Sequence, residues 1–234
     1  MITLNNAEFL ALWEAGYRLH PLDRGLLAIR ASLPDEGTTY AVADWPLGMR
    51  NRALAQFHML YFGPRLEGWT TCAECGEKLE FEMDCRALAD SPVAERPQVT
   101  VAGQNFRLPT SRDLVHIATE SDTEQAVLGL LRKCSVETDS QAQWSNETIE
   151  AIANEMAVTD PLAEISLGFE CPMCHHASEE SLDLPTFLWN EIESRARRLL
   201  AEVHVLATTY GWTEAAILGM SDVRRATYLQ MVRE

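Results

Sequence analysis

The chain has 234 residues and a net charge of −16, with 47% hydrophobic and 23% charged residues. These fractions are ordinary for a globular protein, and the apolar runs are far shorter than the roughly 18 residues that a membrane span requires. Residues 63–185 hold 8 basic and 23 acidic side chains, a balance of −15. Because nucleic-acid binding needs cationic surface, we expect no nucleic-acid partner and no membrane span.

The first part of the chain is predicted to be helical. Asn6 is expected to cap a first helix, and Pro21 is expected to lie in the first turn of a second. A loop is expected at residues 34–37. Asp44 precedes Trp-Pro and is expected to cap a third helix, which ends at Gly63 followed by proline.

Two short motifs separated by 95 residues dominate the sequence: Cys72-x-x-Cys75 and Cys171-x-x-Cys174. The spacing lets two thiolates from one tight turn bind the same metal ion. Two such turns supply the four sulfur ligands that Zn²⁺ prefers. We therefore predict one zinc ion per chain, bound by these four cysteines.

The residues beside the motifs predict β-strands. Leu79, Phe81 and Met83 alternate with acidic residues after the first motif. A similar alternation runs through residues 165–169 before the second motif. Turns and strands in this order predict a small antiparallel zinc ribbon built from two distant C-x-x-C knuckles.

Three other interpretations of the cysteines remain open. A redox C-x-x-C is usually single and opens a helix beside a parallel sheet. Disulfides require an oxidising compartment, and the chain does not begin with the layout of a signal sequence. The segment from Cys171 to His175 matches the haem-attachment pattern C-x-x-C-H, but this leaves Cys72 and Cys75 without a role. We favour zinc, in a reducing cytoplasm.

The predicted zinc site is structural, because four thiolates close the metal's coordination shell whereas a catalytic zinc keeps a position for water. His175 and His176 are interpreted as polar residues of the second turn, although either is an alternative ligand. Gly76 stands where a knuckle often needs a positive φ, and His175 occupies the corresponding place. We identify no catalytic residues and expect a protein that is not an enzyme.

Between the two knuckles the sequence predicts an inserted helical segment with one hairpin. Residues 98–108 read as two strands around a glycine turn. Thr110 and Asp113 resemble a capping box, although the box prefers Glu or Gln at its second position. Helices are expected at residues 122–134 and 145–156, the second of them beginning at a capping serine.

The C-terminal part contains the longest predicted helix, residues 185–210, which ends at Gly211. Thr213 and Ser221 are expected to cap two shorter helices. The long helix has one continuous apolar stripe, and internal packing of this stripe is favoured over a partner surface. Its members are Leu188, Ile192, Ala196, Leu199, Val203, Leu206 and Tyr210.

We therefore expect a mainly helical α+β protein in three regions: a helical region at 1–62, the zinc ribbon with its insertion at 63–185, and the C-terminal helices at 186–234. Cys85 and Cys134 lie outside the knuckles and are expected to be buried thiols. A surface salt bridge is the favoured role of Arg112.

Several segments carry a resemblance to a known family over nearly the full chain. They are Phe62-Gly63-Pro64-Arg65-Leu66, the run from Phe106 to Leu114, Phe187-Leu188-Trp189-Asn190-Glu191-Ile192, and Tyr210-Gly211-Trp212-Thr213-Glu214 with Ile217-Leu218. In order and spacing the chain resembles a family of phage-like contractile injection loci, related to the baseplate hub assembly proteins of contractile-tailed phages. His175 departs from the glycine expected after the second knuckle.

The resemblance implies a baseplate component or an assembly chaperone whose partners are other baseplate or tail proteins, and a cytoplasmic protein that assembles with a phage-tail-like particle. The alternative is a zinc-ribbon adaptor or regulator in transcription or translation. An adaptor of that kind needs a basic face, and the acidic residues of 63–185 disfavour it.

Overall fold

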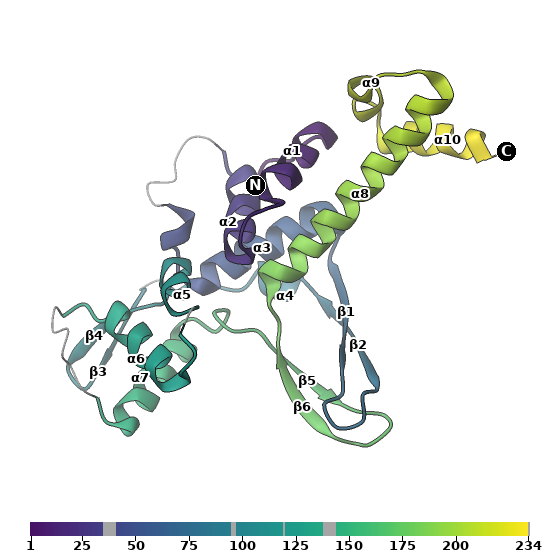
Figure 1. Cartoon of the computed structure of the whole chain (residues 1–234). Helices are drawn as coiled ribbons and strands as arrows, with labels where there is room; N and C mark the ends of the chain where they lie inside the picture. Colours follow the sequence, from purple (N-terminus) through teal and green to yellow (C-terminus); the bar gives the residue numbers. More distant parts are fainter. Residues whose placement is uncertain (35–40, 95–96, 119, 138–143, 234) are drawn as a thin grey trace. The chain divides into compact units, whose positions relative to one another are not determined.

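The computed structural model describes residues 1–34, 41–94, 97–118, 120–137 and 144–233. Within them helices are joined by short antiparallel hairpins, so the predicted α+β class is confirmed (Figure 1). Among the described helices, none is long and apolar enough to cross a lipid bilayer. The loop expected at residues 34–37 lies, apart from Pro34, outside the described residues.

Contacts divide the chain into two compact units: Met1–Pro34 together with Pro185–Glu234, and Asp35–Leu184. The first unit is thus built from the two ends of the chain. The three regions predicted from the sequence, 1–62, 63–185 and 186–234, are consecutive stretches of the chain and not contact units. The division into these regions stays a prediction.

The first unit is helical. Its elements are α1 (Asn6–Gly16), α2 (Pro21–Ala31), α8 (Leu184–Tyr210, from Pro185 on), α9 (Glu214–Leu218) and α10 (Asp222–Arg233). The apolar stripe of α8 is buried from Leu188 to Leu206, as predicted, while Tyr210 at its end is 38% exposed. Trp189, next to this stripe, is packed closely against α1, since a Cβ added at Gly16 would lie 2.1 Å from Trp189 Cη2.

The helix α1 begins one residue earlier than predicted, so the assignment of Asn6 as its cap is wrong. The cap is Asn5, whose side-chain oxygen accepts a hydrogen bond from the Glu8 N–H at 3.0 Å, while the Glu8 carboxylate accepts the Asn5 N–H at 2.8 Å. This reciprocal pair is a capping box. Asn6 instead donates to the Leu218 carbonyl in α9 at 3.4 Å.

The second unit contains three hairpins and the remaining helices. In chain order these are η1 (Val42–Asp44), α3 (Leu47–Phe62), β1 (Arg65–Thr71), β2 (Lys78–Asp84), α4 (Arg86–Ala89), β3 (Gln98–Val101), β4 (Gln104–Arg107), α5 (Ser111–Ile117), α6 (Thr123–Cys134), α7 (Asn146–Thr159), β5 (Ser166–Glu170) and β6 (Ala177–Ser181). The strands pair as β1-β2, β3-β4 and β5-β6, each pair an antiparallel sheet of two strands.

The cap of α3 does not come from Asp44, so that prediction is also wrong. Asp44 ends the short helix η1 and forms an ion pair with Arg112, which confirms the surface salt bridge predicted for Arg112. At the N-terminus of α3 the Asp160 carboxylate accepts the Gly48 N–H at 2.9 Å, and the Pro109 carbonyl accepts the Leu47 N–H at 3.1 Å. Asp160 follows α7 and lies 112 residues further along the chain.

The inserted segment has its own apolar core between the hairpin β3-β4 and the helices α6 and α7. The buried members are Val99, Phe106, Leu108, Leu131, Cys134, Ile152 and Met156. The hairpin and both helices match the sequence prediction, although α7 extends to Thr159.

Cys85 and Cys134 are fully buried thiols, as predicted. Burial raises the pKa of Cys85 to about 11 and that of Cys134 to about 12. Both therefore remain protonated at neutral pH and behave as small apolar side chains.

The Thr110–Asp113 capping box is also confirmed. The Asp113 carboxylate accepts the Thr110 N–H at 2.8 Å and binds Arg107 through two hydrogen bonds of 2.7 Å. An aspartate suits the position here because its short side chain bonds both the cap and the arginine.

Candidate metal centre

Each C-x-x-C motif forms the turn of a hairpin. The first motif connects β1 to β2, in which Thr71 pairs with Lys78. The second connects β5 to β6, in which Glu170 pairs with Ala177. Strands β2 and β5 were predicted from their alternating residues, whereas β1 and β6 were not, because neither has the same apolar alternation. Figure 1 shows the two turns at the same end of the hairpin pair.

The two turns share one backbone geometry. In the first, the Gly76 N–H donates to the Cys72 carbonyl at 2.9 Å, and the Cys72 N–H donates to the carbonyl of residue 77 at 2.8 Å. In the second, the His175 N–H donates to the Cys171 carbonyl at 2.9 Å, and the Cys171 N–H donates to the carbonyl of residue 176 at 2.9 Å. Equivalent turns present their sulfur pairs in equivalent ways.

The residue after each second cysteine has a left-handed backbone, as predicted. The φ angle is 74° at Gly76 and 58° at His175. Glycine adopts this conformation without cost, whereas histidine carries a Cβ that is strained there. The second turn therefore keeps its shape despite an unfavourable residue, which indicates that the turn geometry is enforced by its surroundings.

The structure brings all four predicted ligands together. Cys72 Sγ lies 3.6 Å from Cys174 Sγ, and Cys75 Sγ lies 3.5 Å from Cys171 Sγ. The four sulfur atoms are all within 4.8 Å of one another. A tetrahedral ion with bonds of about 2.3 Å to sulfur needs sulfur separations of about 3.8 Å. The cluster therefore has the dimensions of a four-sulfur metal site.

These separations are too long for a disulfide, whose sulfur atoms are about 2.05 Å apart, and all four cysteines are free. The first cysteine of each motif is buried and the second is exposed. Because each close sulfur pair joins one motif to the other, both motifs contribute equally to a single site.

Apolar side chains lie beside the sulfur atoms at the tips of the two hairpins. The strands of β1-β2 and β5-β6 belong to separate sheets. Buried apolar contact around the sulfurs comes from Leu79, with Phe169 packed against it, and the rings of Phe81 and Phe169 meet edge to face at 6.0 Å. This aromatic pair is not predictable from the sequence, because no local pattern links residues so far apart.

Backbone N–H groups aimed at the sulfur atoms change their acidity. The backbone N–H groups of Cys75 and, to a smaller extent, Glu74 lower the pKa of Cys72. In the second turn the N–H groups of Cys174 and Met173 lower the pKa of Cys171 to about 7. At Cys75 and Cys174 such bonds are outweighed by the neighbouring sulfurs together with partial desolvation, so the pKa of Cys75 is raised and that of Cys174 is raised to about 12. Without metal, the Cys174 thiol stays protonated at neutral pH, so binding of a metal by this residue releases a proton.

The histidines of the second turn lie outside the cluster. The group of potential ligands consists of the four cysteines, and His175 Nδ1 lies 3.6 Å from the Glu170 carboxylate with a side chain that is 80% exposed. In this arrangement His175 faces the strand β5 and not the sulfurs. The four cysteines provide a complete tetrahedral set by themselves.

Comparisons of the chain with protein-family models, curated proteins and solved structures found no match.

Proposed function

We propose that the four cysteines bind one structural Zn²⁺ and that the protein is a non-enzymatic baseplate component or assembly chaperone of a phage-like contractile tail or injection system. The zinc proposal is supported by the four sulfur atoms within 4.8 Å of one another. The baseplate proposal is supported by the order and spacing of the sequence segments described above.

A zinc ion bound here has its coordination shell filled by Cys72, Cys75, Cys171 and Cys174. Four thiolates leave no position for a water molecule or a substrate, and bound zinc has no redox chemistry. The ion therefore supplies a crosslink between two hairpins and holds them in one orientation. A fixed pair of hairpins suits a protein that docks onto partners during assembly.

The metal is tested by elemental analysis of the purified protein, with one zinc per chain as the expected result. The double variant Cys72→Ser with Cys171→Ser removes one ligand from each turn and should lose the metal. Cys85→Ala is the matched control, since it removes a buried thiol outside the cluster and should retain one zinc. A metal-free protein of equal stability, or one that contains iron, would contradict the proposal.

The C-terminal helix α10 is the proposed partner surface. Val223 is 78% exposed and Met231 is 56% exposed. Arg225 of the same helix is buried and pairs with Glu202 at 2.5 Å and Asp222 at 2.9 Å. Its role is to attach α10 to α8, so the interface is assigned to the exposed apolar residues.

The baseplate role is tested by co-purification with particle components and by mass spectrometry of purified particles. Val223→Glu with Met231→Glu should abolish association with baseplate proteins while the zinc content is unchanged. Val158→Glu, at a 77% exposed position of α7, is the control and should associate normally. If both variants associate like the wild type, the interface is elsewhere. If the wild type associates with no tail component, the baseplate proposal is wrong.

Absence of nucleic-acid binding is part of the same proposal. A titration with mixed oligonucleotides at low salt should show no saturable binding, because the acidic residues of 63–185 repel phosphates. Saturable binding that weakens steeply as salt is raised would favour the zinc-ribbon adaptor instead.

A further inference from the structure

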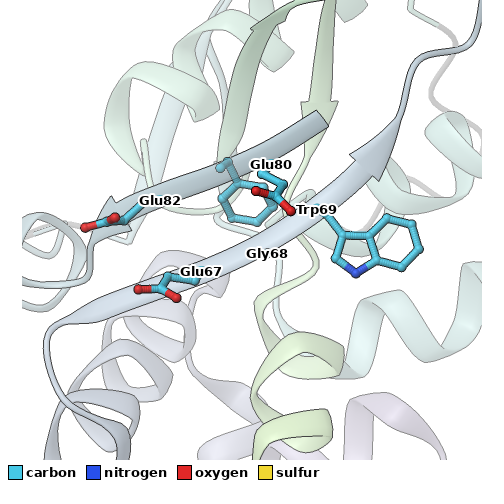
Figure 2. Close-up of a pocket in the computed structure, with 6 residues that line it drawn as sticks. Glu67, Gly68, Trp69, Glu80 and Glu82 are labelled. Atoms are coloured by element: carbon cyan, nitrogen blue, oxygen red, sulfur yellow. The ribbon is translucent and has the colours of Figure 1, made fainter. Parts of the chain in front are cut away.

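One face of the hairpin β1-β2 carries a feature that takes no part in the cysteine cluster. Residues on this face are exposed at every second position of both strands. Trp69 is 63% exposed, although tryptophan is usually well buried. A hollow of about 490 Å³ lies along the two strands of the hairpin (Figure 2). It is lined by Glu67, Gly68, Trp69, Glu80, Phe81 and Glu82.

The strand register places three carboxylates around this hollow. Glu67 lies directly opposite Glu82, and Trp69 lies directly opposite Glu80. Like charges at directly paired positions destabilise a hairpin, so the Glu67–Glu82 pair works against the fold that contains it. Figure 2 shows these two carboxylates at one end of the hollow, the indole at the other end, and Glu80 between them.

The protein already pairs cations with this face. Arg65 Nη1 lies 4.0 Å from a Glu67 carboxylate oxygen, and both side chains are more than 60% exposed. Lys78 Nζ lies 2.7 Å from a Glu80 carboxylate oxygen and 5.5 Å from the centre of the Trp69 ring. A carboxylate and an aromatic face thus act together on one ammonium group, the first through an ion pair and the second through a cation–π interaction. Lys78 and Glu80 are both more than half exposed, and an exposed pair of this kind is readily replaced by a competing cation.

We propose that this face binds an extended, arginine-containing segment of a partner protein. Every second residue of a strand faces the same side of the sheet. The Glu67–Glu82 pair and the Trp69–Glu80 pair are therefore separated by the same distance as alternate residues of an extended peptide. One arginine of an Arg-x-Arg segment bridges the facing carboxylates of Glu67 and Glu82, and the next stacks on Trp69.

Arginine suits the face better than lysine, because its planar guanidinium bonds to two carboxylate oxygens at once and stacks on indole. The proposed surface is separate from the cysteine cluster, and it does not rest on the baseplate assignment. A zinc-loaded protein that fails every baseplate assay still allows the surface to be tested.

The experiment measures fluorescence anisotropy of a labelled peptide in which two arginines are separated by one threonine, titrated with the zinc-loaded full-length protein. Glu67→Gln with Glu82→Gln should weaken binding about tenfold, and Trp69→Thr about fivefold. Trp69→Phe retains an aromatic face and should restore part of the affinity. Zinc content and circular dichroism establish that each variant is folded.

The protein's overall acidity attracts any cationic peptide, so a charge-matched control is needed. Glu150→Gln with Glu155→Gln makes the same change in net charge at exposed positions of α7 and should weaken binding less than twofold. The same peptide with citrulline in place of arginine should not bind. Equal losses in the two glutamate pairs, or an unchanged affinity in Trp69→Thr, would overturn the proposal. Self-association through Trp69 without peptide binding would also overturn it, in favour of a second copy of the chain.

Discussion

The cap of α3 by Asp160 gives a sharp prediction for Gly48. A Cβ added at Gly48 would lie 1.8 Å from Asp160 Oδ1, a distance that no real Cβ contact shows. Gly48→Ala therefore forces the buried carboxylate away and breaks its 2.9 Å hydrogen bond to the Gly48 N–H. The helix loses its cap, and a carboxylate that burial already disfavours loses a donor.

The magnitude follows from three contributions. Loss of the hydrogen bond to a buried acceptor costs about 1–3 kcal/mol, and displacement of packed atoms costs about 1–3 kcal/mol. Alanine is a better helix former than glycine by about 1 kcal/mol. We expect Gly48→Ala to lower the free energy of unfolding by about 3 kcal/mol.

Urea denaturation followed by circular dichroism measures this change, and Gly129→Ala is the matched control. Gly129 lies within α6, where an added Cβ would meet only Ile117 Cγ2 at an ordinary 3.8 Å. The same substitution should stabilise the protein there by up to about 1 kcal/mol. In an Asp160→Ala background Gly48→Ala should lose its cost, because the clashing group is gone. A Gly48→Ala protein as stable as the wild type would refute the reasoning.

Two further predictions concern the metal and the acid stability. Removal of zinc by a chelator should raise amide hydrogen exchange in residues 65–84 and 166–181. Helices α6 and α7 should stay protected, because they have a separate apolar core. Hydrogen exchange measured by mass spectrometry tests this, and unchanged exchange in both hairpins would contradict it. Burial opposes ionisation of Asp113, but its hydrogen bonds with Arg107 and Thr110 outweigh burial and hold its pKa below the usual value. Its contribution to stability is therefore present above the unfolded pKa of about 3.9 and lost as pH falls through the folded pKa. Asp113→Asn should lower stability by about 2 kcal/mol at pH 7 and by less at pH 3, and equal losses at both pH values in urea denaturation would contradict this.

The elements governed by neighbouring residues were predictable from the sequence. The C-x-x-C spacing by itself determines a tight turn, and the positive φ of the residue after it follows from the turn. The Thr110–Asp113 box and the stop at Gly211 are similarly local, since capping groups lie within a few residues of the backbone they bond. The predicted first cap failed by one position because Asn5 and Asn6 are adjacent and only Asn5 stands three residues before Glu8.

The sequence also determined the composition of the cysteine cluster, because two C-x-x-C motifs of identical spacing supply its four members. Only the tertiary structure decided how the motifs combine. Each close sulfur pair joins the first cysteine of one motif to the second cysteine of the other, Cys72 with Cys174 and Cys75 with Cys171. No local rule encodes this crossed pairing, because it depends on how two separate hairpins approach each other.

The cap of α3 shows the same division. A polar residue just before a helix is a good local candidate, and Asp44 occupied that place in the sequence. The fold instead uses Asp44 for the ion pair with Arg112 and satisfies α3 with Asp160 from 112 residues away. A backbone N–H donates to any well-placed oxygen whatever its distance along the chain. The sequence therefore determined that a cap was needed, and the tertiary placement of Asp160 beside the start of α3 decided which residue supplied it.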